Sequence, residues 1–141
     1  MKRPARGARH GRNVLLGALA AMLSSCGPPP VCGSELLDDL ATARRGKDDS
    51  EQDVTKVARL HIAEGADPLT VKELLEQAGF SIVPIRPEHQ PNADMDREYL
   101  ATAGQQACKA FRSIDEIKIV LSERGGRVAK VSAVIHARKV S

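Results

Sequence analysis

Aromatic side chains are nearly absent from this chain: its 141 residues include two phenylalanines, one tyrosine and no tryptophan. Large rings usually supply much of the apolar area that a core buries. A core that lacks them must be built from valine, isoleucine, leucine and alanine. We therefore expect a small hydrophobic core and a domain of modest stability.

Cysteine is also scarce, and the spacing of the few chemically active residues excludes several kinds of site. The three cysteines form no Cys-x-x-Cys pair, so a thioredoxin-like redox motif is not supported. His61 and Glu64 could share a metal ion on one helix, but a metal site needs three or four converging ligands and no second pair stands at ligand spacing. We expect His61 at a core boundary, and no metal or other cofactor.

Catalytic motifs are missing as well. Cys108 with a histidine could form a nucleophilic dyad, but no recognisable motif surrounds it. The pair Gly125-Gly126 is expected to join two strands, and a phosphate-binding loop instead joins a strand to a helix. We therefore assign no catalytic residue from the sequence.

No apolar run is long enough to cross a membrane. The clearest one, residues 14–23, has ten residues, whereas a spanning helix needs about 20. It follows five basic residues and no acidic ones in residues 1–12, and small residues come after it. This order is typical of a secretory signal peptide.

Cys26 makes the signal more specific. It closes the tetrapeptide Leu-Ser-Ser-Cys, which resembles a bacterial lipoprotein signal, in which the cysteine receives a lipid and becomes the new N-terminus. We expect residues 1–25 to be the signal peptide and residues 26–33 to be a lipidated, proline-rich tether. An ordinary secretory signal with a chance cysteine is the alternative. Gly27 favours the outer membrane, by analogy with lipoproteins as a class.

Charge is distributed unevenly once the leader is set aside. The whole chain carries +3, but the chain from Cys26 onward carries −2, and nucleic-acid binding needs a concentrated basic face. We therefore expect no nucleic-acid partner. Residues 27–108 carry −7 and residues 109–141 carry +5. Either the two parts pack together and partly neutralise each other, or the basic part faces anionic lipid head groups or an acidic partner.

With Cys26 assigned to the lipid, Cys32 and Cys108 remain as a candidate disulfide. An extracytoplasmic compartment permits such a bond. It would close a loop of 75 intervening residues, for which the chain-entropy model gives about 4 kcal/mol as an upper figure. Two free thiols, or a bond from Cys32 to another molecule, are the alternatives.

Apolar residues at helical spacing predict three helices before the first strand. The third is the best defined, because Asp67 can cap it, Pro68 takes its first position and Gly79 follows its end. The three helices are expected over residues 34–45, 51–64 and 68–78.

The second half of the chain favours strands. Residues 80–85 predict a strand that Pro84 places at a sheet edge, and residues 86–96 predict a loop. Residues 97–109 fit either a helix or a strand. We favour a strand over residues 98–103, because the final hairpin needs a neighbour to be stable.

The register of the final hairpin follows from its apolar residues, since facing residues lie on the same side of a sheet. A two-residue loop would set Leu121 opposite Lys130. A three-residue loop, residues 124–126, sets Leu121 opposite Ala129 and matches apolar with apolar. We therefore predict the three-residue loop.

These patterns together predict an α+β fold. Two to three N-terminal helices should pack on a small antiparallel sheet of three to four strands that ends in a C-terminal β-hairpin. Residues 34–141 are expected to form this one domain.

Two segments of the domain resemble a known family. Residues 64–71, Glu-Gly-Ala-Asp-Pro-Leu-Thr-Val, lead into Leu74-Leu75, and residues 122–128, Ser-Glu-Arg-Gly-Gly-Arg-Val, lie at the expected hairpin turn. Behind a lipid cysteine and a short tether, they resemble small outer-membrane lipoproteins of the BamE/SmpA type over about residues 64–136. The resemblance implies helices followed by strands and a role in envelope assembly. It carries over no functional residue.

The sequence thus predicts a lipid-anchored protein of the bacterial envelope that faces the periplasm. Its domain is expected to bind or scaffold another envelope protein, through the edge strand near Pro84 or the basic hairpin. A small periplasmic enzyme is the alternative, and it would need a deep pocket with converging polar groups. An inhibitor or immunity-type lipoprotein is a third candidate, which a compact disulfide-tied domain would suit.

Overall fold

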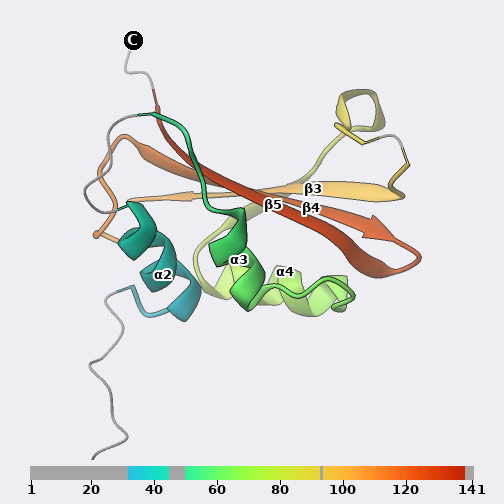
Figure 1. Ribbon diagram of the computed structural model, residues 1–141, viewed down its shortest axis with the longest axis horizontal. Helices are drawn as coiled ribbons and strands as arrows, with labels where there is room; N and C mark the ends of the chain where they lie inside the picture. The colour runs from blue at the N-terminus through green and yellow to red at the C-terminus, as the bar shows by residue number, and fades with distance from the viewer. Residues whose placement is uncertain (1–31, 45–49, 93, 139–141) are drawn as a thin grey trace, which may run out of the picture.

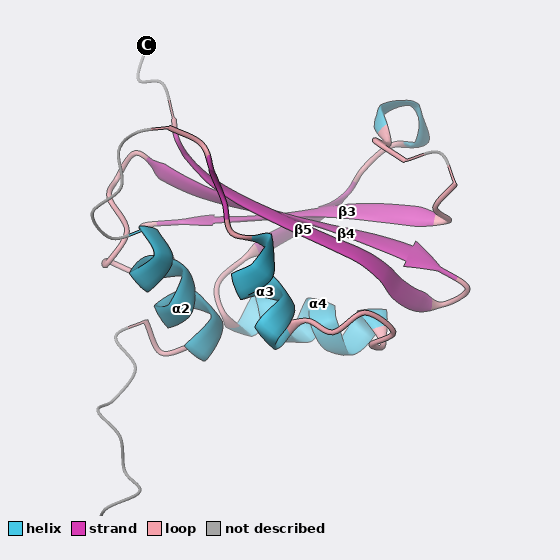
Figure 2. Ribbon diagram, in the orientation of Figure 1, coloured by secondary structure: helices cyan, strands magenta, loops and turns pink. Residues whose placement is uncertain are grey.

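The computed structural model describes residues 32–44, 50–92 and 94–138. Within these ranges three α-helices and one five-stranded antiparallel sheet form, so the predicted α+β class is confirmed. The three α-helices lie together on one face of the sheet, and in the described ranges the other face carries no α-helix (Figures 1 and 2). The expected signal peptide and the lipid cysteine, Cys26, lie outside the described residues.

The helices appear in the predicted order. They are α2 (Glu35–Arg44), α3 (Thr55–His61) and α4 (Pro68–Gln77). Helix α4 begins as its sequence predicts, since Asp67 Oδ2 accepts a hydrogen bond from the Thr70 amide at 3.2 Å. Helix α2 also agrees with its expected range to within a residue at its end.

The second predicted helix is too long at both ends, because α3 ends at His61 and the first predicted residues form a strand. Gln52 and Asp53 form strand β1 (Gln52–Asp53), which pairs with the last strand. The Val54 amide donates to the Ala133 carbonyl at 2.9 Å, and the Ala133 amide donates to Thr55 Oγ1 at 3.0 Å. These backbone partners come from a strand almost eighty residues away, so helical spacing within a local window could not reveal them.

The sheet has five strands, and the expected three to four is therefore corrected. In spatial order it runs β1-β5-β4-β3-β2, with every pair antiparallel. Strand β3 covers the favoured residues 98–103 of the segment for which a helix was the alternative, so that strand is confirmed. The remaining strands are β2 (Ser81–Pro84), β3 (Arg97–Gly104), β4 (Asp115–Arg124) and β5 (Arg127–Ala137), with a 3₁₀ turn, η1 (Pro87–His89), between β2 and β3.

Strand β2 lies at the sheet edge, as Pro84 predicts. The Ile85 amide donates to the Glu98 carbonyl of β3 at 2.8 Å. Alternate residues of an antiparallel strand direct their backbone hydrogen-bonding groups to the same neighbour. The backbone groups of Val83 therefore also face β3, whereas those of Ile82 and Pro84 face away from the sheet. The missing N–H of the proline therefore removes no bond of the ladder, and it leaves the outer edge with one donor fewer.

The turn between β4 and β5 has two residues, so the predicted three-residue loop is wrong. Arg124 pairs with Arg127, which leaves Gly125 and Gly126 in the turn with φ of 60° and 73°. Positive φ at both central residues defines a type I′ turn, whose twist matches that of the flanking strands. Glycine adopts this geometry without the steric cost that a Cβ would bring.

A bulge next to this turn restores the match of apolar residues. The pairing shifts between Ser122 and Glu123, so that Ala129 is the extra residue of β5. Leu121 then lies opposite Val131 and not opposite Ala129. Apolar residues do face each other, as expected, but a bulge in β5 and not a three-residue loop produces this pairing.

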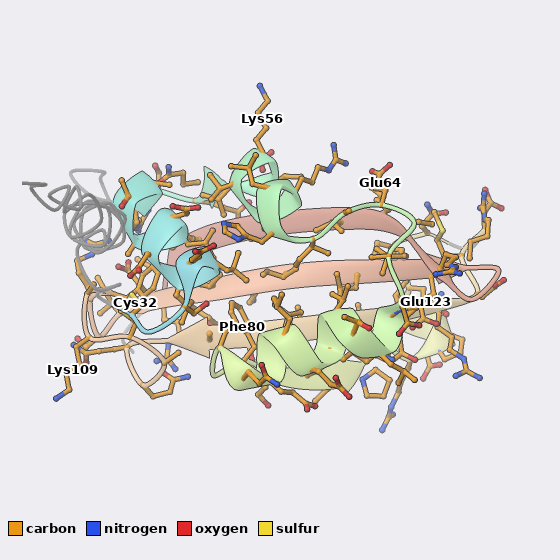
Figure 3. All side chains as sticks on the ribbon, turned by 90° about the horizontal axis from the view of Figure 1, so that it is seen from below. Cys32, Lys56, Glu64, Phe80, Lys109 and Glu123 are labelled. Carbon is orange, nitrogen blue, oxygen red and sulfur yellow. A yellow bond between two sulfur atoms is a disulfide. The ribbon has the colours of Figure 1, made fainter. Side chains whose placement is uncertain are left out.

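The core lies between the three helices and the inner face of the sheet. Its members are mostly aliphatic, as the composition predicts, and Phe80 and Phe111 are both buried in it. Phe80 sits just past the end of α4, at the start of β2 (Figure 3). The fully buried residues of largest volume include Leu36, Leu37, Leu40, Ile62, Leu75, Ile117, Ile119, Leu121 and Ile135.

Gly79 brings the connection between β3 and β4 close to the end of α4. Its φ is +97°, and a Cβ there would lie 3.0 Å from Ala107 Cβ. Both the backbone conformation and the lack of space therefore require glycine. Ala107 directly precedes Cys108, so this close approach also positions one half of the candidate disulfide.

Candidate functional site

The two cysteines singled out in the sequence meet in the structure. Cys32 and Cys108 are joined by a disulfide with an S–S distance of 2.03 Å and a Cα–Cα distance of 5.0 Å. Cys32 is the first described residue, and Cys108 lies between β3 and β4. Because its sulfur is bonded to Cys32, Cys108 offers no thiol for a nucleophilic dyad.

Local hydrogen bonds hold both sides of the bridge. The Cys32 amide donates to Asp38 Oδ1 of α2 at 2.7 Å. On the other side, the Phe111 amide donates to the Cys108 carbonyl at 3.2 Å, and the Phe111 ring is 2% exposed. The start of the described chain is therefore fixed to one end of the sheet by a covalent bond and by packing.

A buried carboxylate lies at the same end of the molecule. Asp115, the first residue of β4, is 1% exposed and accepts bonds from Arg44 Nη2 at 3.2 Å and from Arg112 Nη2 at 2.9 Å. Arg44 is 5% exposed and also donates to the Ser50 carbonyl. The cluster ties the end of α2 to the start of β4.

The pKa of Asp115 lies below its ordinary value. Burial alone would raise this pKa, because it disfavours the charged form. The hydrogen bonds from Arg112 and the charges of Arg44 and Arg112 lower it by more. The carboxylate is therefore charged at neutral pH, and its partners identify it as a structural ion pair.

The histidines do not converge on a catalytic or metal site. His61 Nε2 lies 2.7 Å from Asp39 Oδ2 of α2, while Glu64 pairs with Arg59 at 3.4 Å. The sequence-based pair of His61 and Glu64 is therefore not formed. The His61 side chain is 16% exposed, which places it at the boundary of the core as expected.

The other two histidines of the described chain lie elsewhere. His136, on β5, is 3.6 Å from Glu116 and 23% exposed, and His89 stands in the η1 turn beside Glu88. Across the residues that the structure describes, no three His, Cys, Asp or Glu side chains come close enough to hold a metal ion. In those same ranges, no helix has the length and apolar character needed to cross a membrane.

An open hollow of about 510 Å³ lies at the disulfide end of the molecule. It is lined by two cationic side chains, Lys109 and Arg138, and by the polar residues Gln105, Gln106 and Ser113. Neither a carboxylate nor a histidine lines it, so it lacks an acid–base pair. Its chemistry favours a polar or anionic ligand group.

The open face of the sheet, opposite the three α-helices, presents a short apolar row. Val83, Leu100 and Val120 lie side by side across β2, β3 and β4. Val83 is 50% exposed and the other two are partly exposed. By strand alternation this face also carries Lys118, Lys130, Arg124, Glu116, Thr102 and Ser132.

One end of this open face is covered. Glu98 belongs to it by alternation, yet the residue is 1% exposed, and its Oε1 accepts a bond from Ser122 Oγ at 3.1 Å. The segment of residues 85–92 rises above the sheet at this end (Figure 1). Among the described residues, Glu98 Oε2 has no hydrogen-bond partner. The middle of the face, the end nearer the disulfide and Lys130 on β5 therefore stay accessible.

No protein-family model, no curated protein and no solved structure matches the chain. The likeness to lipoproteins of the BamE/SmpA type therefore stays a prediction from the sequence. The function must be argued from the residues and their geometry.

Proposed function

We propose that this protein is a lipoprotein of the bacterial cell envelope, anchored through Cys26 in the outer membrane and facing the periplasm. The observation that carries the proposal is the disulfide between Cys32 and Cys108. Such bonds persist in oxidising compartments outside the cytoplasm. The bridge also joins the chain covalently to the domain at Cys32, six positions after Cys26. The segment between the proposed lipid and the domain is therefore short.

We further propose that the domain is a non-catalytic binding module and that its partner docks on the open face of the sheet. The apolar row of Val83, Leu100 and Val120 supplies a centre that a partner can desolvate. Lys118 and Lys130 lie beside this row, and a protein with acidic side chains round an apolar patch would complement them.

The anchor is tested by intact mass of the protein purified from membranes. The native protein should begin at Cys26 and carry acyl chains, whereas a Cys26→Ser variant should be unacylated and uncleaved at that site. The matched control is the double variant Cys32→Ser/Cys108→Ser, which should keep the acyl chains. A native mass without any acyl group would end the proposal.

The binding face is tested by photo-crosslinking in intact cells. A photoreactive residue at position 83 should form a protein adduct, and one at position 69 should not, although Val83 and Leu69 are both exposed, at 50% and 68%. Reversing a charge on the face, with Lys130→Glu, should lower the adduct yield about fivefold, the effect of roughly 1 kcal/mol. The matched reversal on α3, Lys56→Glu, should leave the yield unchanged. Equal adducts from both positions, or none above the unirradiated background, would contradict a partner on this face.

A further inference from the structure

The bridge between Cys32 and Cys108 limits how far one end of the domain can lie from Cys26. Cys32 is six positions after Cys26, and a fully extended chain covers about 3.6 Å per residue. The two bridged Cα atoms are 5.0 Å apart. The Cα of Lys109 therefore stays within about 30 Å of the Cα of Cys26, however the tether is arranged.

The opposite end of the domain is not held in this way. Strand β4 has ten residues and starts near the disulfide, so its far end lies about 31 Å further along the sheet. The turn at Gly125 and Gly126 stands at that far end. If Cys26 carries the lipid, the disulfide end is the part of the domain that the tether holds near the membrane.

The disulfide end has two sides of opposite charge. On one side the first turn of α2 presents Glu35 and Asp38, with Asp39 next to them. On the other side the connection between β3 and β4 presents Lys109, which is exposed and projects away from the domain (Figure 3). The hollow that contains Lys109 and Arg138 is on this second side, and no carboxylate lines it.

The groups in the hollow suit phosphate oxygens. Lys109 and Arg138 supply positive charge, and the Gln105 and Gln106 amides can donate hydrogen bonds. Arg138 Nε lies 4.0 Å from Glu116 and Arg138 is 60% exposed, so this ion pair leaves much of the guanidinium accessible. Arg112 is engaged by Asp115 and is not needed for the contact.

We propose that this end of the domain rests on anionic phospholipid head groups, with Lys109 and Arg138 as the contact residues. The inference depends on the proposed lipid anchor at Cys26. An anionic surface attracts the basic side and repels the acidic first turn of α2, so it selects one orientation among those that the tether allows. The domain then stands on the connection between β3 and β4, and its open sheet face points sideways, where a neighbouring envelope protein can reach it.

The experiment measures the reactivity of lysines on the lipidated protein. Protein purified from membranes is added to preformed vesicles of phosphatidylcholine alone, or of phosphatidylcholine with phosphatidylglycerol, and treated with a membrane-impermeant amine-acylating reagent. Lys109 should react about fivefold more slowly on the anionic vesicles. Lys56, which projects from α3 on the helical side (Figure 3), is the internal control and should react equally on both. In about 1 M salt, where the screening length is about 3 Å, the difference should vanish.

Two variants make the test specific. Arg138→Glu should abolish the protection of Lys109, whereas Arg127→Glu, beside the turn at the far end of the hairpin, should leave it intact. If the protein sediments with both kinds of vesicle but Lys109 and Lys56 react alike, the orientation is wrong and the anchor stands. If the protein does not sediment with neutral vesicles, the anchor itself is wrong, and the inference falls with it.

Discussion

Removal of the Cys32–Cys108 disulfide is expected to lower the free energy of unfolding by about 4 kcal/mol. The bond joins residues 76 apart in sequence, so its loss releases a long loop in the unfolded chain. The total free energy of unfolding of a small domain is only about 5–15 kcal/mol, and this core has few aromatic rings. The melting temperature should fall by about 20 °C.

Urea unfolding of the oxidised and reduced protein, followed by circular dichroism, measures this effect. Reduction should lower the urea midpoint. It should also steepen the fall of the unfolding free energy with urea concentration, because the unbridged unfolded chain exposes more surface. The double variant Cys32→Ser/Cys108→Ser is the control and should unfold at the reduced midpoint whether or not a reductant is present. Equal midpoints for oxidised and reduced protein would show that the bond does not stabilise the fold.

Replacing the buried carboxylate, with Asp115→Ala, is expected to cost about 3–5 kcal/mol. Arg44 is 5% exposed and would lose its carboxylate partner in the interior. Removing Arg112 instead, with Arg112→Ala, should cost less than about 1 kcal/mol, because this arginine is 44% exposed. Replacing both buried partners, with Arg44→Met and Asp115→Leu together, should recover most of the loss. A double variant as unstable as Asp115→Ala would show that the damage comes from packing and not from an unpaired charge.

The same carboxylate predicts a pH dependence. The pKa of Asp115 in the folded protein is lowered from its ordinary value of 3.8, so folding favours the charged form. The stability that it contributes is fully present above about pH 4 and is lost as the pH falls through the folded pKa. Below pH 4 the wild-type protein should therefore lose stability more steeply than Asp115→Asn, as measured by urea midpoints at several pH values. If the urea midpoints of the two proteins fell equally with pH, a charged Asp115 would be contradicted.

Local sequence signals were sufficient to predict a helix or strand where residues within the segment mark its ends or its position in the sheet. The Asp67 cap, the following proline and Gly79 predicted α4 correctly. Pro84 predicted the edge position of β2, because a missing N–H is tolerated only where no neighbour needs it. Both outcomes depend on backbone groups within a few residues.

Sequence reasoning failed where distant backbone groups compete for a segment. The second helix was predicted to begin at about residue 51, yet Gln52 and Asp53 pair with β5. The hairpin loop was miscounted for a related reason, since a bulge at Ala129 satisfies the apolar pairing that an odd loop would otherwise provide. A pattern of apolar positions specifies which residues face the core, but several backbone paths can satisfy the same pattern.

The candidate sites divide in the same way. Cys32 and Cys108 could be named from the sequence, because only two cysteines remain after Cys26 and the compartment restricts their chemistry. The pair of Arg44 and Asp115 gave no signal, since its members are 71 residues apart and each looks like an ordinary surface charge. The row formed by Val83, Leu100 and Val120 was equally hidden, because it exists only when three strands are placed side by side.

By itself, the sequence determined the α+β class, the candidate lipid cysteine and the candidate bridge, because composition, spacing and order along the chain carry those properties. Only the tertiary structure decided which side of the sheet is left open and which end is held near Cys26. It also placed the exposed Lys109 beside a hollow that no carboxylate lines. Those properties depend on distances between residues far apart in the chain, which a one-dimensional pattern does not contain.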